Sequence, residues 1–291
     1  MKFKLFNKEN DYEFLKKIGM GLVLVAAILI LKDEILWDLG FYDDVSSSSE
    51  VSIDEEVTED CSVSGIELHG SIYTYIPEHA EGDTDFDYDA VASEDVAYLI
   101  EEANNNNTQI KAILVEVDSS GGYPVAGEEI SVAIKNSEKP VIGLIRGSGL
   151  SAAYWAISSA DKIFASKNSD VGSIGVTMSY LNNVGKNIKE GFAYEQLSSG
   201  KFKDAGNPDI PLTKEGKDLF MRDINIVYQN FMETVSLNRN IPIEKVRSFA
   251  DGSTVLGGKA KELGLIDEIG GFPEVEAYIG ELIGEEAVIC W

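Results

Sequence analysis

The sequence predicts an α/β domain that follows a separate N-terminal segment. From Gly65 onward, short apolar runs with the spacing of strands alternate with longer runs that have the spacing of helices. This alternation is typical of βαβ units that build one layered domain. The chain has 291 residues, of which 44% are hydrophobic, so it can bury one substantial core.

The N-terminal segment contains an unbroken run of apolar and glycine residues from Ile18 to Leu31. This run spans about 21 Å, so apolar residues beside it must help it to cross a hydrocarbon core of about 30 Å. Charged residues at 32–34 follow where a signal peptide has a small-residue cleavage site, and lysines flank the run at both ends. An uncleaved membrane anchor at 18–37 is therefore favoured over a signal peptide or a buried core helix.

Charge around the anchor predicts its orientation. Five lysines precede the apolar run, whereas residues 33–60 hold eleven acidic residues and no Lys or Arg. The positive-inside tendency then predicts a cytoplasmic N-terminus at 1–17, and everything beyond the anchor lies outside the cell membrane. Residues 38–64, with serines at 46–49 and many acids, are expected to form a solvated stalk before a domain at 65–291.

The net charge of -26 excludes some functions. Such a surface repels phosphate backbones and anionic lipid, which disfavours nucleic-acid binding and a body that lies flat on a membrane. The two cysteines, Cys61 and Cys290, do not form a CxxC pair, so a structural zinc site is not expected. Both lie on the same side of the anchor, and both a disulfide and two unpaired core thiols remain open.

The elements of the domain are expected in alternating order. Strands are expected at 66–72, 113–117, 141–145, 163–165 and 173–178, with a further one just before Lys201, and helices at 91–104, 125–135, 151–159 and 214–237. The two glycines at 121–122, between a strand and a helix, allow backbone N–H groups to point at one spot. An oxyanion hole, an anion cradle or a plain tight turn all fit this pattern.

A candidate nucleophile follows the next strand. Ser151 lies between small residues at a junction of strand and helix, as in a nucleophile elbow. A simple N-cap role and the rival Ser148 remain open at this stage. The two histidines, His69 in a strand and His79 in the acidic loop 77–89, lack a motif-like setting for a base.

Lysine is the alternative base in serine hydrolases, provided that it is removed from water. Lys201 and Lys203 are the candidates that follow the later strand, and spacing alone does not choose between them.

Five segments in one order carry a resemblance to a known family. They are Asp118–Gly122, Ser151–Trp155 with Ala160–Ala165, Val171–Val176, Ser199–Asp204, and Ala250–Gly257 with Ala260–Asp267. Over about 65–271 the chain resembles the signal peptide peptidase A family of membrane-anchored serine proteases, in its short, single-domain form. It departs from the family pattern at Ser120, where proline is usual, and at Ala152 and Ala153, where two glycines are frequent.

The resemblance implies a crotonase/Clp-protease-like fold with a repeated ββα core. It implies Ser151 as nucleophile, Lys203 as general base, Ser173 as the serine that hydrogen-bonds the lysine, and the backbone N–H groups of Gly122 and Ala152 as oxyanion donors. The backbone N–H is kept when Ala replaces Gly.

The resemblance also implies a homo-oligomeric ring in which serine and lysine meet across a subunit boundary. The implied substrates are cleaved signal peptides and other unfolded apolar segments near the membrane, and no metal or cofactor is required. Two alternatives differ in class. A crotonase-type acyl-CoA enzyme needs neither Ser151 nor Lys203 and would have no supply of CoA outside the cell. A non-catalytic ring scaffold has no reason to keep Ser151, Ser173 and Lys203 in one pocket.

Overall fold

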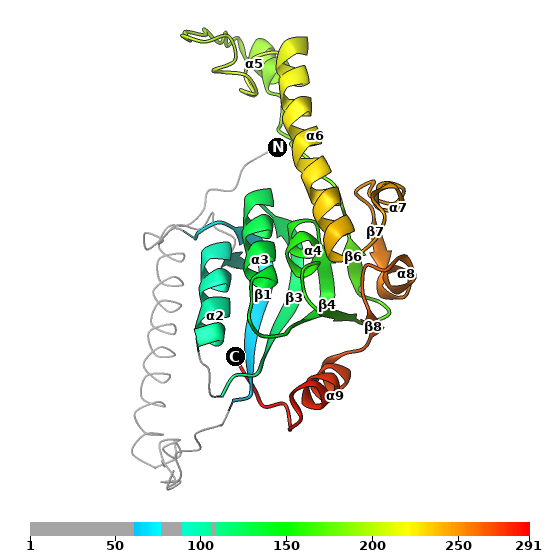
Figure 1. Cartoon of the computed structure of the whole chain (residues 1–291). Coiled ribbons are helices and arrows are strands. Elements are labelled where there is room, and N and C mark those ends of the chain that lie inside the picture. The colour runs from blue at the N-terminus through cyan, green and yellow to red at the C-terminus, as the bar shows by residue number, and fades with distance from the viewer. Residues whose placement is uncertain (1–60, 77–88, 106–108) are drawn as a thin grey trace, which may run out of the picture. The chain divides into compact units, whose positions relative to one another are not determined.

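Runs rich in Val, Ile and Leu form the centre of one sheet (Figure 1). The strands β1 (Val63–Tyr73), β3 (Ala112–Gly122), β4 (Val141–Leu150) and β5 (Lys162–Ala165) are parallel neighbours. In the computed structural model, the sheet has the order β2-β1-β3-β4-β5-β8, with β2 (Ala90–Ala92) and β8 (Glu268–Ile269) at its ends. Parallel strands of this kind need helices on both faces, which explains their continuous apolar runs.

Three short strands attach to this order. β6 (Asp170–Gly172) pairs with the last residues of β4, and β7 (Thr254–Leu256) runs antiparallel to β6. β9 (Ile289–Cys290) pairs with the first residues of β1. The start of β4 therefore pairs with β5 and its end with β6, so β4 carries the chain from the main sheet to the place where β6 and β7 meet.

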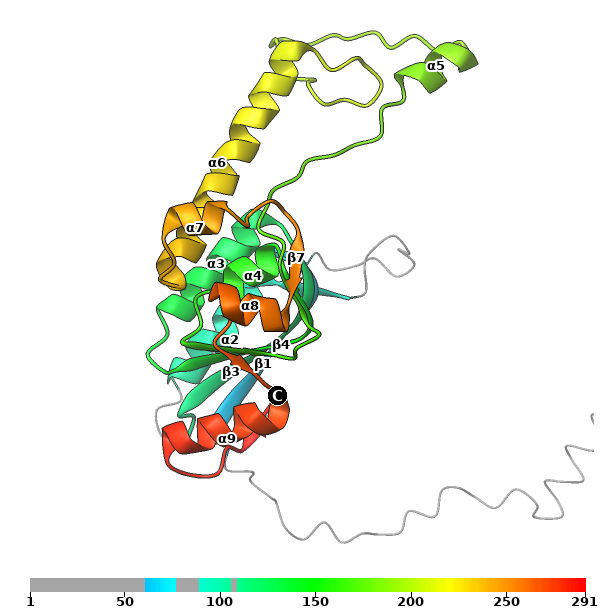
Figure 2. The ribbon, with the colours of Figure 1, turned by 90° about the vertical axis from the view of Figure 1, so that its right-hand side faces the viewer.

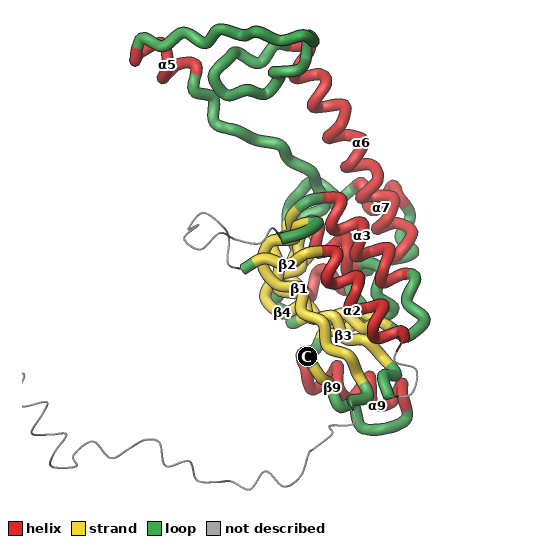
Figure 3. Tube along the Cα trace, turned by 90° about the vertical axis from the view of Figure 1, so that its left-hand side faces the viewer, coloured by secondary structure: helices red, strands yellow, loops and turns green. Residues whose placement is uncertain are grey.

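Side-chain alternation along β3 divides the interior into two cores. Ile113, Val115 and Val117 belong to the larger core, whereas Ala112 and Leu114 face a smaller one. The larger core includes residues of α2 (Ser93–Asn105), α3 (Pro124–Lys135) and α4 (Ala152–Ile157). The smaller core is closed by α9 (Phe272–Ile283) on the opposite face. Figure 3 shows α2 and α3 side by side along the sheet.

The long helix α6 (Lys214–Asn238) begins at Thr213, whose hydroxyl accepts the Gly216 N–H as an N-cap. Only its C-terminal half contributes large side chains to the core, and the Phe231 ring stacks on Trp155 with a centroid separation of 4.6 Å. We call the segment 173–213, between β6 and α6, the arm; it contains α5 (Val184–Glu190). Figures 1 and 2 show the part around α5 beyond the N-terminal half of α6, away from the sheet. Two further helices, α7 (Ile243–Arg247) and α8 (Gly257–Leu263), follow α6.

The structure describes residues 61–76, 89–105 and 109–291. The segment predicted to be cytoplasmic, the predicted anchor at 18–37, nearly all of the predicted stalk and His79 fall outside these residues. Among the described residues, no helix has the length and hydropathy of a membrane span.

Most predicted elements are confirmed, and two are wrong. The strand predicted at 173–178 is absent, because Gly172 (φ 99°) and Ser173 (φ 50°) leave the extended conformation directly after β6. The strand predicted before Lys201 is a loop of the arm. β3 and β4 also continue further than predicted, to Gly122 and Leu150.

The open question of the cysteines is answered by a disulfide. Cys61 and Cys290 are bonded, with their Cα atoms 5.8 Å apart, and the bond joins the start of β1 to β9. The following residue, Trp291, covers Gly65 so closely that a Cβ there would lie 2.5 Å from the indole ring.

Candidate active site

The last residues of β3, Ser119–Gly122, are held against the neighbouring strand β1 by one buried hydroxyl. Ser119 is 1% exposed, and its Oγ donates to the Gly70 carbonyl (2.6 Å) and accepts the Gly121 N–H (3.0 Å). The pairing of β1 with β3 shifts register opposite this point, between His69 and Ser71. The serine therefore connects an irregularity in β1 to the turn that carries the glycine pair.

Gly121 must be glycine for two reasons. Its φ of 106° is a conformation that residues with a Cβ rarely adopt, and a Cβ there would lie 2.7 Å from the Cβ of Ser151 and 2.9 Å from the Leu150 carbonyl oxygen. At Gly122, a Cβ would lie 2.0 Å from the carbonyl oxygen of Ile72. At the end of β3, Gly121 thus packs directly against Ser151, and Gly122 packs against Ile72.

Ser151 forms a sharp turn between β4 and α4. Its backbone has φ 53° and ψ −123°, which costs free energy for any residue with a side chain and marks functional positions. Its N–H donates to the Gly172 carbonyl (2.8 Å), and its own carbonyl accepts the Trp155 N–H (2.9 Å). Its side chain makes no capping hydrogen bond, so an N-cap role does not account for it.

The side chain of Tyr154 holds the short helix α4 in place. This fully buried side chain donates a hydrogen bond from its hydroxyl to the Leu265 carbonyl (2.8 Å). Burial raises the pKa of the Tyr154 phenol well above its usual value, so the hydroxyl remains a donor at every ordinary pH. The hydrogen bond from Tyr154 fixes the start of α4, where Ala152 supplies a backbone N–H.

Ser173 is held by the loop that leads into β7. Its backbone N–H donates to the Ser253 carbonyl (3.1 Å), and its Oγ donates to the Gly252 carbonyl (3.1 Å). That loop is itself organised by Asp251, whose Oδ1 accepts both the N–H (2.9 Å) and the Oγ (2.5 Å) of Ser253. The strained φ of Ser173 is therefore fixed from the β7 side of the molecule.

These features meet at one cavity of about 360 Å³. Its lining residues are Gly122, Pro124, Ser151, Ser173, Gly175, Val176, Thr177, Asp251 and Gly252. Three of the predicted site residues, Gly122, Ser151 and Ser173, are thus brought together, with Ala152 next to Ser151 in the chain. A nucleophile, two candidate backbone donors and a second hydroxyl around a hollow can carry out acyl transfer if a base is supplied.

Sequence reasoning left Ser119 and Asp251 without a role. Ser119 lies beside the glycine pair, and Asp251 lies in one of the segments that resemble the family, but the sequence does not indicate the hydrogen-bond partners of either residue. Both act through hydrogen bonds between loops that are distant in sequence.

The rival nucleophile Ser148 does not line this cavity. Its Oγ (3.0 Å) and its N–H (2.9 Å) both donate to the carboxylate of Asp118. The early histidine is also elsewhere: His69 Nε2 lies 3.5 Å from a carboxylate oxygen of Glu116, which in turn accepts a hydrogen bond from Arg146 (2.5 Å). Neither side chain is placed to act on Ser151.

The predicted base, Lys203, is not brought to the cavity within one chain. It is exposed, it lies in the arm, and its backbone N–H donates to the Gly200 carbonyl in a local turn (3.1 Å). Lys201 is also exposed and lies 3.9 Å from a carboxylate oxygen of Glu215. None of the described residues that line the cavity is a lysine or a histidine.

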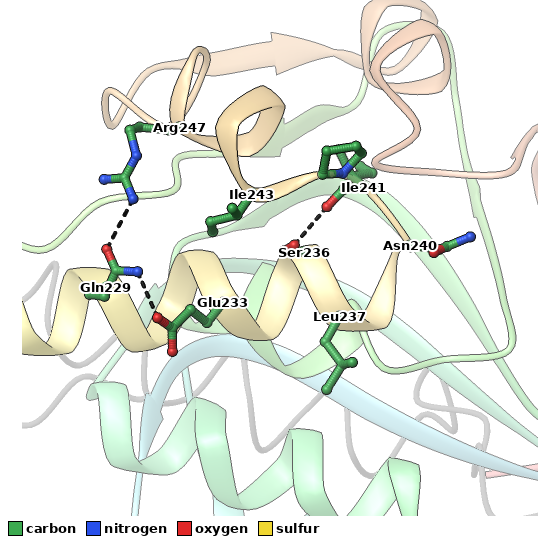
Figure 4. A pocket seen from close by; sticks show the side chains of 9 residues that line it. Gln229, Glu233, Ser236, Leu237, Asn240, Ile241, Ile243 and Arg247 are labelled. Atoms are coloured by element: carbon green, nitrogen blue, oxygen red, sulfur yellow. Dashed lines mark hydrogen bonds between the residues drawn. The ribbon is translucent and has the colours of Figure 1, made fainter.

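Another pocket, of about 550 Å³, lies between α6 and α7 (Figure 4). Gln229 donates to Glu233 and accepts from Arg247, and the hydroxyl of Ser236 donates to the Ile241 carbonyl. The one hydroxyl there is therefore committed to the backbone, and this pocket offers no activated nucleophile.

Residues 133–284 match peptidase family S49. Among curated proteins, the chain is 37% identical over 163 residues to "Putative protease MJ0651" of Methanocaldococcus jannaschii, covering 55% of this chain and 52% of that protein. It is 30% identical over 206 residues to "Protease 4" of Haemophilus influenzae, covering 70% of this chain and 33% of that protein. It is 32% identical over 164 residues to "Putative signal peptide peptidase SppA" of Enterococcus faecium, covering 55% of this chain and 48% of that protein.

The matched region spans about half or less of the length of these three relatives. Among solved structures, a ClpP1 mutant from Listeria monocytogenes matches with a TM-score of 0.47 and 14% sequence identity, covering 72% of this chain and 92% of that one.

Proposed function

Because the chain belongs to peptidase family S49, we propose that it is a serine endopeptidase with Ser151 as nucleophile and Lys203 as general base. The observation that supports this most is the backbone of Ser151, held at φ 53° beside the Gly121 turn and within the cavity that Ser173 also lines. A strained serine next to convergent backbone donors is the arrangement of a nucleophile elbow.

The reaction follows from these groups. Neutral Lys203 accepts the proton of the Ser151 hydroxyl as Oγ attacks the peptide carbonyl, and the backbone N–H groups of Gly122 and Ala152 stabilise the oxyanion. The lysine then gives its proton to the leaving amine, and an acyl-enzyme remains on Ser151. A water molecule, activated by the same lysine, hydrolyses the ester and restores the serine. Ser173 orients the lysine through its hydroxyl.

A second copy of the chain supplies Lys203 in this proposal. The arm exposes large apolar side chains, including Leu181 (85% exposed) and Leu197 (98% exposed). It also holds four lysines and four acids, so it is neutral in a chain whose net charge is -26. A neutral, apolar surface on an acidic protein suits contact with another copy, and an arm that reaches its neighbour generates a ring. Burial in that contact provides the water-poor setting that a lysine base needs.

The setting of the domain is also part of the proposal. Residues 18–37 anchor the chain in the cell membrane, the N-terminus is cytoplasmic, and the protease domain lies outside. The disulfide between Cys61 and Cys290 supports this, because disulfides persist in oxidising compartments. Substrates are cleaved signal peptides and other unfolded apolar segments near the membrane, in keeping with the name of the Enterococcus faecium relative.

Complementation between two inactive variants tests the proposal. The full chain in detergent is prepared as Ser151→Ala and as Lys203→Ala, with Ser148→Ala and Lys201→Ala as matched controls. Cleavage of an unfolded reporter protein and labelling by a fluorophosphonate are measured for each. We expect loss of cleavage in the first two variants, near-normal cleavage in the controls, and recovery when the two inactive variants are mixed and allowed to exchange subunits.

Two results would contradict parts of this proposal. Absence of recovery on mixing, although both variants assemble and exchange, would remove the shared site. A wild-type protein that assembles but neither labels nor cleaves would favour the non-catalytic scaffold instead.

A further inference from the structure

The candidate active site contains one charged side chain, and the reaction described above does not use it. Among the nine residues that line the cavity, Asp251 is the only one whose side chain ionises at ordinary pH. Its carboxylate is exposed to solvent and is fixed in orientation by the N–H and Oγ of Ser253. The side-chain hydrogen bond from Ser253, the largest cause, lowers the pKa of Asp251, so the group is ionised at neutral pH.

No cation neutralises this charge within the described residues. Every ion pair found between the described residues involves other carboxylates. An unpaired negative charge that lines the same cavity as Ser151 and Gly122 disfavours an oxyanion there by Coulomb repulsion. A cation that arrives with a bound molecule removes this disadvantage.

Two groups could bring that cation: Lys203 of a neighbouring copy, or the peptide substrate. A lysine that serves as base must be neutral, and a carboxylate in contact with it would hold its proton in place. A positively charged side chain of the substrate has no such conflict. The rest of the lining is glycine, small apolar or hydroxyl-bearing, which leaves room for an extended peptide whose cationic side chain reaches Asp251.

We propose that Asp251 determines specificity, by pairing with a Lys or Arg side chain of a peptide bound in the cavity. This inference rests on the proposed peptidase function and names a class of substrate for it: unfolded segments that combine apolar residues with a basic residue close to the scissile bond. From the strength of an ion pair at an exposed carboxylate, we expect the pair to favour a basic peptide about 2- to 5-fold.

Asp251 also has a structural task, which the test must separate from its charge. Through Ser253 it organises the loop that holds Ser173. Asn at this position keeps an oxygen that accepts both hydrogen bonds of Ser253 and removes only the negative charge. The variant Asp251→Asn therefore isolates the electrostatic role, and an unchanged melting temperature verifies that the loop is intact.

Binding is measured without catalysis, in the full chain that carries Ser151→Ala. Two fluorescent peptides are compared by anisotropy, identical except for Lys or Gln at one position, which is moved in turn through the residues around the centre. At the favoured position we expect the Lys peptide to bind about 2- to 5-fold tighter at low salt, with a smaller ratio at high salt. Asp251→Asn should bring the ratio close to one and leave the affinity for the Gln peptide unchanged.

A matched control is Glu128→Gln, which removes an exposed carboxylate of α3 outside this cavity and should preserve the ratio. Equal binding of the two peptides at every position overturns the inference, as does a Lys preference that survives Asp251→Asn or disappears equally in Glu128→Gln. Since Ser151 is absent from these measurements, they separate the two ideas. A wild-type protein that cleaves no peptide counts against the peptidase function, whereas the binding ratio alone decides the role of Asp251.

Discussion

Replacing Ser119 by alanine should damage catalysis and stability together, because one buried hydroxyl holds the end of β3, which carries Gly122, one of the two proposed oxyanion donors. In the native structure its Oγ contacts the Gly70 carbonyl at 2.6 Å and the Gly121 N–H at 3.0 Å. Both backbone groups lie at places where strand pairing is irregular, so the ladder does not replace the lost partner. Alanine fills nearly the same space and adds no steric conflict.

The size of the effect follows from those two contacts. A buried polar group that loses its partner costs about 1–3 kcal/mol, so Ser119→Ala should lower the free energy of unfolding by about 2–4 kcal/mol. For a domain of this size that corresponds to a fall in melting temperature of about 5–12 °C. The same change loosens the Gly121–Gly122 turn that packs against Ser151, and loss of one oxyanion donor costs about 100- to 1000-fold in kcat. A loosened donor should cost less, about 10- to 100-fold.

Ser120→Ala is the matched control, because Ser120 is the next residue of the same loop and is exposed. Melting by circular dichroism and steady-state cleavage of a peptide are compared for the two variants. We expect Ser119→Ala to reduce kcat with little change in KM, since the oxyanion forms only along the reaction path. Equal melting temperatures and equal kcat in the two variants would refute the reasoning.

Three other predictions concern the stability of the domain. Reduction of the disulfide between Cys61 and Cys290, which are 229 positions apart, should lower the free energy of unfolding by about 2–5 kcal/mol, and an unchanged urea midpoint in reductant would contradict this. The pKa of Glu268 is lowered chiefly by its hydrogen bond from Lys261, so its stabilising contribution is present above the unfolded-state pKa and is lost as pH falls through the folded-state value. Glu268→Gln should therefore be less stable than wild type at pH 6 and equally stable near pH 2, whereas a constant difference would count against this ion pair. The side chain of Arg239 is 6% exposed and forms an ion pair with Asp267. Arg239→Ala should therefore lower the free energy of unfolding by about 3 kcal/mol in a denaturant titration, and a loss below about 1 kcal/mol would contradict this.

The sequence predicts most of the fold because local patterns specify it. Runs such as 113–117 and 141–145 are apolar and β-branched, and they form β3 and β4 with the expected parallel pairing. The alternation of side chains along β3 between two cores follows from strand geometry alone. The strand predicted at 173–178 is wrong because Ser173 has a positive φ and donates hydrogen bonds to the carbonyl groups of residues about 80 positions later, which a local pattern does not contain.

The residues of the candidate site also differ in how well the sequence predicts them. Ser151 and the glycine pair could be identified because their backbone requirements appear as small residues and glycines in the sequence. Ser119 and Asp251 could not, because serine and aspartate are common in loops and their partners are revealed only by folding. Whether Cys61 meets Cys290 was likewise undetermined until the pairing of β9 with β1 was known.

Lys203 marks the limit of what one folded chain explains. The elements that hold Ser151, Gly122 and Ser173 are buried or tied to the sheet, whereas residues 191–203 of the arm, which carry the lysine, are all exposed. A serine alone at neutral pH is a weak nucleophile, so in the proposed reaction an isolated chain with its lysine apart from the serine would be inactive. If assembly brings the two together, activity depends on concentration and on the integrity of the arm. Leu181→Asp, which changes neither the serine nor the lysine, should then dissociate the assembly and abolish cleavage in parallel, and a variant that stays assembled but inactive would argue against this coupling.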